Sequence, residues 1–259
     1  MEWEEYLKKI AEAKVKPIVY AINQKLKDLS QKDSYTNAHC SAVSKYAFFL
    51  SLRFKLSQKD RRKLALAGRV HDLGKLIFPD KLFSYNDKLE EGDWKWIHRH
   101  PEEGFMIVYN LLNVMLGSDM TPEKLDWLIL VLYHHWRYDE NGKDRAYPKK
   151  LLEEETKEFC KKFKPKITLV LNKKQNGEKK DKDIDTWRVL IGILHAVDSI
   201  DAVTSSVRRP MGKEPGKIAT IIDEIKTQKG TNYHPDVAEK VWEIGPRRWE
   251  EFKTEMGIP

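Results

Sequence analysis

Two adjacent pairs of ionisable residues each close an apolar run of the sequence. His71 and Asp72 end the apolar part of KLALAGRVHDLGK, and His134 and His135 end WLILVLYHH. A polar group buried without a partner is costly, so each pair must be hydrogen-bonded, exposed to solvent or bound to a cation. One such pair can be a helix end satisfied by water, but two are hard to explain by packing alone. Imidazole and carboxylate together suit first-row metals such as iron, manganese, cobalt or zinc.

A centre with two metal ions also needs a carboxylate that bridges them. Asp72 is the natural bridge, because each of its two oxygens can bind a different ion. The other ligands should come from separate helices that converge on the site. The candidates are His39, His100 and Asp198, each of which lies at or inside a predicted helix.

The elements that must position these residues are mainly helical. Apolar residues recur at three- and four-residue steps along most of the chain, which is the periodicity of amphipathic helices. Ser57 and Thr121 are expected to be N-caps. The predicted helices cover residues 2–30, 39–54, 58–70, 93–99, 101–116, 122–135, 184–206, 217–226 and 235–244.

Residues 164–182 depart from the helical pattern. The segment ITLVL is typical of a strand, and the Asn176-Gly177 pair that follows is a strong signal for a tight turn. We therefore expect a small β-hairpin inserted into an all-α fold. Since no repeat or linker divides the chain, we expect one helical domain over residues 33–259, preceded by an N-terminal helical extension over residues 1–32.

Composition narrows the class of protein. With 259 residues, of which 41% are hydrophobic, the chain can bury a substantial core. The net charge of +7 favours an anionic partner, although interleaved acidic residues indicate a basic surface more than a nucleic-acid interface. Cys40 and Cys160 lack the spacing of a disulfide framework or a zinc finger. Because there is no signal peptide or apolar span of membrane length, we expect a cytoplasmic protein without membrane contact.

Taken in order, the motifs resemble those of the HD-GYP branch of the HD-domain phosphohydrolases. The resemblance runs from about residue 33 to 240. It is carried by DSYTNAH (33–39), HDLGK (71–75), HPEEG (100–104), HH with a following D (134, 135, 139), AYP (146–148), VDSIDAVTS (197–205), RRP (208–210) and NYHPDV (232–237).

The resemblance implies a ligand set and a reaction. One metal ion would be held by His39, His71, Asp72 and Asp198, and the other by Asp72, His100, His134 and His135. Members of the family typically carry iron or manganese and hydrolyse cyclic dinucleotides, above all cyclic di-GMP. Two neighbouring ions suit this chemistry, because they lower the pKa of a bridging water and stabilise charge on the phosphate.

Two further residues complete the predicted catalytic set with Asp72. Lys75, one helical turn after His71, could contact a phosphate oxygen, or could be a solvated lysine near a helix C-terminus. Asp201, one turn after Asp198, could position the nucleophile or the ligand.

The parts that would recognise a nucleotide differ from the family pattern. The GYP tripeptide is Ala146-Tyr147-Pro148 here, and alanine lacks the easy access of glycine to positive φ. The acid that usually follows the histidine pair is Trp136, which could stack on a base or pack against the protein. The predicted substrate-binding residues are Lys75, Trp136, Tyr147, Arg208 and Arg209.

Three functions follow from these observations. The leading hypothesis is a metal-dependent phosphodiesterase acting on a cyclic dinucleotide or a related phosphodiester. The second is an HD-type nucleotide phosphohydrolase or a nuclease acting on single-stranded nucleic acid. The third is a nucleotide-sensing module that keeps the metal site but has lost catalysis. A homodimer formed through the N-terminal helical region is compatible with each of them.

Overall fold

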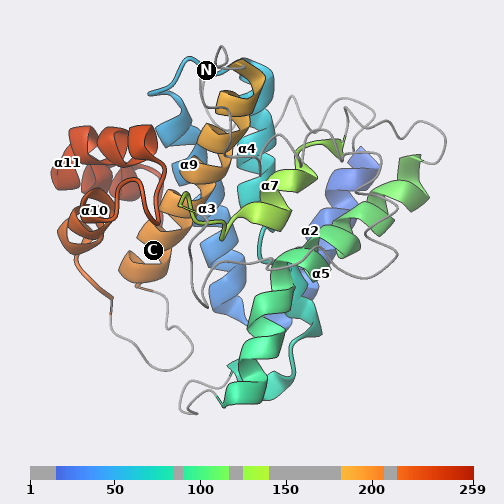
Figure 1. Ribbon diagram of the computed structural model, residues 1–259. Coiled ribbons are helices and arrows are strands. Elements are labelled where there is room, and N and C mark those ends of the chain that lie inside the picture. The colour runs from blue at the N-terminus through green and yellow to red at the C-terminus, as the bar shows by residue number, and fades with distance from the viewer. Residues whose placement is uncertain (1–15, 84–89, 117–124, 140–181, 207–214) are drawn as a thin grey trace.

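The computed structural model (Figure 1) describes residues 16–83, 90–116, 125–139, 182–206 and 215–259. Every regular element in these ranges is helical, so the predicted all-α class is confirmed for the part of the chain that the structure describes. The predicted hairpin at 164–182 lies outside these ranges, apart from Lys182, which begins a helix.

The elements of the described ranges are α-helices and two short 3₁₀ helices, which lie between α4 and α5. In chain order they are α2 (Lys16–Lys32), α3 (Ser34–Ser51), α4 (Gln58–Val70), η1 (Leu73–Ile77), η2 (Asp80–Phe83), α5 (Glu91–Leu116), α7 (Leu128–Tyr133), α9 (Lys182–Thr204), α10 (Ile218–Thr227) and α11 (Pro235–Glu255).

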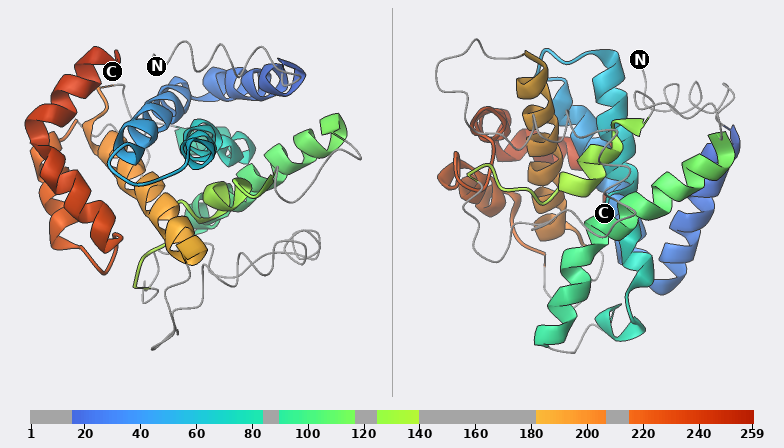
Figure 2. Two further views of the ribbon diagram at one scale, coloured as in Figure 1. Left: turned by 90° about the horizontal axis from the view of Figure 1, so that it is seen from above. Right: turned by 45° about the vertical axis from the view of Figure 1, so that its right-hand side comes forward.

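Helices α3, α4, α7 and α9 form the centre of the molecule (Figures 1 and 2). Helix α3 packs against both α4 and α9, while α7 packs against α4, α5 and α9. Helices α10 and α11 pack together on one side of α9, and α2 and α5 lie on the opposite side of the molecule. The candidate ligands come from the central helices and from α5.

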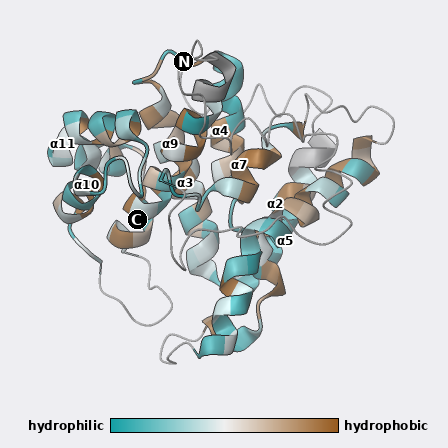
Figure 3. Ribbon diagram, viewed as in Figure 1, coloured by the Kyte–Doolittle hydropathy of each residue, from teal (hydrophilic) through white to brown (hydrophobic). Residues whose placement is uncertain are grey.

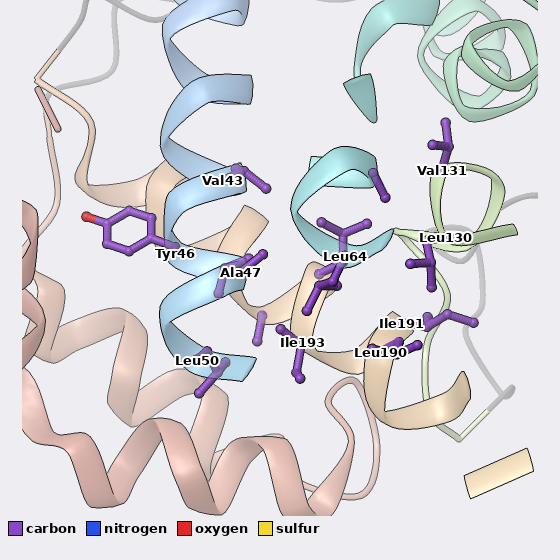
Figure 4. Close-up of a cluster of buried hydrophobic side chains, with 14 of the residues drawn as sticks. Val43, Tyr46, Ala47, Leu50, Leu64, Leu130, Val131, Leu190, Ile191 and Ile193 are labelled. Carbon is purple, nitrogen blue, oxygen red and sulfur yellow. The ribbon is translucent and has the colours of Figure 1, made fainter. Parts of the chain in front are cut away.

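The hydrophobic core fills the space between the central helices (Figure 4). Val43 and Leu50 of α3 lie there with Leu64 of α4, Leu130 of α7 and Ile193 of α9, and all five are fully buried. All six residues of α7 are buried, and Figure 3 shows this short helix as largely hydrophobic. A helix without a solvent face is fixed by packing on every side, which makes α7 a rigid support for the histidine pair that follows it.

Local signals predicted several helix ends well. The N-cap of α4 is confirmed, since the Ser57 hydroxyl accepts a hydrogen bond from the Asp60 amide at 3.1 Å. Helix α3 begins five residues earlier than predicted, because Asp33 caps it by accepting from the amides of Tyr35 and Thr36. Thr121 lies outside the described residues.

Three further predicted helix boundaries are wrong. Helix α7 covers only Leu128–Tyr133, whereas the sequence predicts one helix over residues 122–135. Helix α5 runs through Pro101 instead of breaking at His100, and α11 runs to Glu255 instead of ending at Ile244. Within α11, Gly245 has a φ of 74°, which glycine adopts without strain, so a kink joins two helical stretches.

Helix α5 continues through Pro101 for a local reason. Pro101 has no N–H, so it cannot donate to the carbonyl of Ile97 as an ordinary residue would. The ring of His100 takes that role instead, because its Nδ1 lies 2.6 Å from the Ile97 oxygen. The helix therefore continues, and the side chain of His100 is tied to its own helix.

A close backbone crossing brings η1 against α5. A Cβ atom on Gly74 would lie 1.9 Å from the His100 carbonyl oxygen and 2.5 Å from the Gly104 nitrogen. A Cβ on Gly104 would in turn lie 3.0 Å from the Gly74 nitrogen. Only glycine fits at residue 74, and this approach sets the turn after Asp72 beside His100.

The N-terminal helix belongs to the same core. Ile22, Leu26 and Leu29 of α2 are buried, and α2 packs against α3, α5 and η1. A domain boundary at residue 32 stays a prediction. Among the helices that the structure describes, none combines the length and the apolar character needed to cross a bilayer.

Candidate metal centre

The predicted ligands converge from five helical elements. His39 comes from α3, and His71 and Asp72 come from the junction of α4 and η1. His100 comes from α5, His134 and His135 follow the end of α7, and Asp198 comes from α9. They form two clusters with ligand atoms close enough to share an ion: His39, His71 and Asp198 in the first cluster, and His100, His134 and His135 in the second cluster.

Asp72 lies between the two clusters and presents one oxygen to each. Its Oδ2 is 3.6 Å from His39 Nε2 and 3.5 Å from His71 Nε2, whereas its Oδ1 is 3.1 Å from His100 Nε2. A carboxylate in this position can bind two ions, one through each oxygen. The arrangement is the one expected of the bridging residue.

Three of the histidines are oriented by carbonyls of their own helices. Nδ1 of His71 lies 2.9 Å from the Gly68 oxygen, and Nδ1 of His134 lies 2.7 Å from the Val131 oxygen. Both carbonyls belong to the last turn of a helix, where no amide is available to them. His100 uses the carbonyl freed by Pro101 in the same way. Because a carbonyl only accepts, each Nδ1 carries the proton and each Nε2 faces the centre.

His39 is oriented by another helix. Its Nδ1 lies 2.8 Å from Asp201 Oδ2, and its Nε2 lies 2.9 Å from Asp198 Oδ1. A carboxylate behind a histidine is a common way to fix the ring of a metal ligand and to raise its basicity. Asp201 is almost fully buried. In the structure it contacts His39, which is a candidate ligand.

The donor set fits divalent metal ions. The Nε2 atoms of His100 and His134 are 3.1 Å apart, and those of His39 and His71 are 3.2 Å apart. Nitrogen lone pairs at such distances need a proton or a cation between them. The cluster combines imidazole nitrogens with the carboxylates of Asp72 and Asp198, which suits first-row transition metals.

The electrostatics of the centre keep most donors in a metal-binding form. Burial raises the pKa of Asp72, but Lys75, His71 and His100 outweigh it and hold the pKa well below its usual range. The pKa of Asp198 is lowered for the same kind of reason, by His39 and His71. Burial and the neighbouring histidines lower the pKa of His134. The acids are therefore ionised, and His134 is neutral.

His39 and His71 behave differently, because neighbouring groups, carboxylates among them, outweigh burial and raise the pKa of each above its ordinary value. The shift of His39 predicts part of the response of the metal-free protein to pH. Burial lowers its pKa, but Asp198 and Asp201 raise it to about 10. Since this value lies above the 6.5 of an unperturbed histidine, the stabilisation is complete below pH 6.5 and is lost as the pH rises through about 10. We expect the titration of His39 alone to lower the free energy of unfolding by up to roughly 1.4 kcal/mol per pH unit between these limits.

Urea unfolding of protein treated with a chelator, at pH 7, 8 and 9, measures this slope. The His39→Gln variant should show a flatter dependence, because glutamine does not titrate. Equal slopes in the two proteins would contradict the assignment of the effect to His39.

Lys75 contacts the bridging carboxylate. Its Nζ lies 2.6 Å from Asp72 Oδ2, and the lysine side chain is only 23% exposed. Burial lowers the pKa of Lys75, but Asp72 raises it above its ordinary value, so the ammonium stays charged. In the structure the lysine balances the negative charge of Asp72.

The structure places only part of the predicted substrate-binding set. Trp136 is half-buried and packs against the hydrophobic core, and its role in binding a base stays a prediction. Tyr147, Arg208 and Arg209 lie outside the described residues.

Two residues near the centre were not predicted from the sequence. Cys40 is fully buried and forms a third cluster of possible ligand atoms with His71 and Asp72. Its position directly after His39 is the signal that would have drawn attention to it. His195 is buried one helical turn before Asp198, and its ring lies 6.5 Å from that of His135.

Comparison with known proteins gives the family. The HD domain model matches residues 36–164, a range that contains all the candidate ligands except Asp198. Together with the all-helical fold and the clustered histidines and aspartates, this match defines the class, and the chain belongs to the HD-domain family.

Relatives within the family include proteins named as cyclic dinucleotide phosphodiesterases. The chain is 30% identical over 127 residues to a cyclic di-GMP phosphodiesterase of Pseudomonas aeruginosa, covering 49% of this chain and 28% of that protein. It is 24% identical over 237 residues to the 3′3′-cGAMP-specific phosphodiesterase 2 of Vibrio cholerae, covering 92% of this chain and 35% of that protein. The chain thus spans about a third or less of the length of these relatives.

Among solved structures, a similar one is the HD domain of the L. monocytogenes phosphodiesterase PgpH in complex with cyclic-di-AMP. The TM-score is 0.45 and the sequence identity is 20%, with 91% of this chain and 96% of that chain covered.

Proposed function

We propose that the chain is a metal-dependent phosphodiesterase that hydrolyses a cyclic dinucleotide, such as cyclic di-GMP, or a related phosphodiester at a dinuclear centre. The observation that carries this proposal is the position of Asp72, with one carboxylate oxygen toward His39 and His71 and the other toward His100. The first ion would bind His39, His71, Asp72 and Asp198, and the second would bind Asp72, His100, His134 and His135.

Two bound divalent ions, iron or manganese, would supply an activated water and stabilise the charge that develops on the phosphate. The protein contributes preorganisation. Carbonyls at residues 68, 97 and 131 fix three imidazole rings, and Asp201 fixes His39. The ammonium of Lys75 lies at the edge of the centre, where it can contact a phosphate oxygen after leaving Asp72.

The substrate class is supported by the relatives and by charge. Two of the similar proteins are named for cyclic di-GMP and for 3′3′-cGAMP, which are both anionic cyclic dinucleotides. A net charge of +7 suits an anionic substrate. The identity of the bases would depend on residues such as Trp136, Tyr147, Arg208 and Arg209, which lie where the sequence departs from the family pattern.

Hydrolysis assays of the full chain test this proposal. Protein loaded with Mn²⁺, or with Fe²⁺ under anaerobic conditions, is incubated with cyclic di-GMP, 3′3′-cGAMP, cyclic di-AMP, bis(p-nitrophenyl) phosphate and a single-stranded oligonucleotide. We expect a linear dinucleotide from at least one cyclic dinucleotide, over many turnovers.

Three other results would overturn the proposal. Cleavage of the oligonucleotide alone would favour a nuclease. Calorimetric binding of a cyclic dinucleotide without product would favour a sensing module. No reaction and no binding would exclude this substrate class.

A further inference from the structure

A lysine of the N-terminal helix binds the backbone at the end of η1. Nζ of Lys32, the last residue of α2, donates to the Leu76 oxygen at 3.1 Å and to the Phe78 oxygen at 3.2 Å. The 3₁₀ helix η1 directly follows Asp72 and contains Lys75. These contacts therefore join α2 to the segment that carries two residues of the candidate centre.

The sequence after η1 explains why a side chain serves these carbonyls. In a 3₁₀ helix the Leu76 carbonyl would accept from the amide three residues later, but that residue is Pro79, which has no N–H. Phe78 is extended, with φ −62° and ψ 138°, as is usual for a residue before proline, so the helix ends there. Carbonyls at a helix end need donors from elsewhere, and an ammonium is a strong one.

We propose that Lys32 is a positioning residue that holds η1, and with it the ammonium of Lys75, at the metal centre. The inference rests on the proposed function, in which Lys75 contacts a phosphate oxygen. The amide of Lys75 donates to the Asp72 carbonyl at 2.9 Å, and the carbonyl of Lys75 accepts from the Phe78 amide at 3.0 Å. Since Lys32 binds the carbonyl of Phe78, a continuous series of hydrogen bonds leads from α2 to the backbone of Asp72.

The two ends of η1 are fixed by different parts of the fold. The close crossing with α5 at Gly74 sets its start. At its end the ring of Phe78 lies edge on to that of His100, with centroids 6.2 Å apart, and packs with Leu82 and Phe83 in a small cluster apart from the main core. Three buried side chains give less support than the main core, so the contacts from α2 matter most at this end.

The backbone beneath Lys32 is itself well fixed. The Asp33 amide donates to the Leu29 carbonyl at 2.7 Å, and the Asp33 side chain caps α3, the helix that carries His39. Lys32 also contacts Asp80 at 3.5 Å, but that carboxylate is 91% exposed. An ion pair so exposed contributes little in water, so the two carbonyl contacts carry the role of Lys32.

Four substitutions separate these contacts. Lys32→Met keeps the apolar stem of the side chain and removes the ammonium. Lys32→Arg keeps a cation with several donors for the two carbonyls. Asp80→Asn removes the ion pair and leaves the carbonyl contacts in place. Lys25→Met is the matched control on the same helix, because Lys25 is exposed and contacts Asp28 at 3.2 Å.

Native-state hydrogen exchange of the metal-free protein, followed by NMR, measures the hold on η1. The amides of Lys75 and Phe78 are hydrogen-bonded in this segment, so their exchange reports its local opening. In Lys32→Met we expect both amides to exchange about 5- to 30-fold faster, because two hydrogen bonds from a charged donor are lost. Lys32→Arg should lie within about threefold of the wild type. Lys25→Met and Asp80→Asn should match it.

A general loss of stability is controlled by a change on the far side of the molecule. Val241 of α11 is fully buried, so Val241→Ala should destabilise the whole fold. It should leave the local exchange of Lys75 and Phe78 unchanged, since neither α11 nor its core contacts hold η1.

Hydrolysis kinetics test the link from Lys32 to Lys75. The substrate is cyclic di-GMP, or bis(p-nitrophenyl) phosphate if the wild type cleaves only that. Lys32→Met should lower kcat/KM by about 5- to 10-fold in the wild-type background. In the Lys75→Met background it should have almost no further effect, because two residues that act through one contact are not additive.

Two results would overturn the inference. One is exchange of the Lys75 and Phe78 amides in Lys32→Met at the wild-type rates. The other is an equal fall of kcat/KM on adding Lys32→Met to the wild type and to Lys75→Met, which would show that the effect does not pass through Lys75. If the wild type hydrolyses no phosphodiester, the proposed function fails by itself, and the exchange rates still decide whether Lys32 holds η1.

Discussion

Asp72→Asn is expected to abolish the proposed hydrolysis and to prevent both ions from binding tightly. The carboxylate offers one oxygen to each ligand cluster, and an amide offers one oxygen and no charge. The substitution also leaves the ammonium of Lys75 without its partner at 2.6 Å. Losing several kcal/mol of charge stabilisation corresponds to a fall in rate of roughly a thousandfold or more. Turnover of a cyclic dinucleotide and elemental analysis of the purified protein measure the two effects.

The same chemical change on the surface provides a matched control. Asp80 contacts Lys32 at 3.5 Å, but its side chain is 91% exposed, so Asp80→Asn should leave both metal content and rate as in the wild type. Asp72→Asn protein that kept two ions and its full rate would refute the bridging role of Asp72.

Gly74→Ala is expected to be the most damaging single-methyl change. The new Cβ would lie 1.9 Å from the backbone oxygen of His100, and neither backbone can yield without moving Asp72 or His100. We expect a loss of about 3–5 kcal/mol in the free energy of unfolding, at the upper end for a single substitution. Metal binding by the second cluster should weaken as well, because His100 would shift relative to Asp72. Denaturant unfolding and Mn²⁺ titration measure these effects.

Alanine substitutions at two other glycines should give smaller losses of stability than Gly74→Ala. A Cβ on Gly104 would approach the Gly74 nitrogen to 3.0 Å, so Gly104→Ala should be harmful but less so. Gly92 lies in the first turn of α5 with nothing within 4 Å of a new Cβ, so Gly92→Ala should be neutral or stabilising by about 0.5–1 kcal/mol. Similar losses for Gly74→Ala and Gly92→Ala would show that the close crossing is not the cause.

Much of the helical framework follows from local signals, whereas its exceptions depend on contacts between distant residues. Helix α4 has the predicted limits, since its cap Ser57 directly precedes it and its apolar periodicity is local to the helix. The predicted break at Pro101 is wrong because the ring of His100 takes over the carbonyl that proline leaves unpaired. Helix α11 passes its expected end because Gly245 bends the chain without stopping it.

For the site, the sequence indicated which residues could bind metal but not how they are held. The order of the motifs led to seven candidate ligands, and the structure brings them together around Asp72. Their role as ligands remains a prediction. The nearness of Cys40 to Asp72 and the contact of His195 with Tyr233 involve residues far apart in the chain, and no local pattern encodes them.

The His100-Pro101 pair has a consequence for protein engineering. A histidine followed by proline in a helix carries its own acceptor, so the tautomer and the direction of the ring are set within one helical turn. His39 shows the alternative, in which a second helix must deliver Asp201 to the right place. A His-Pro dipeptide could therefore be introduced into a designed helical bundle to present an imidazole nitrogen to a metal. No residue from a neighbouring helix would be needed to orient the ring.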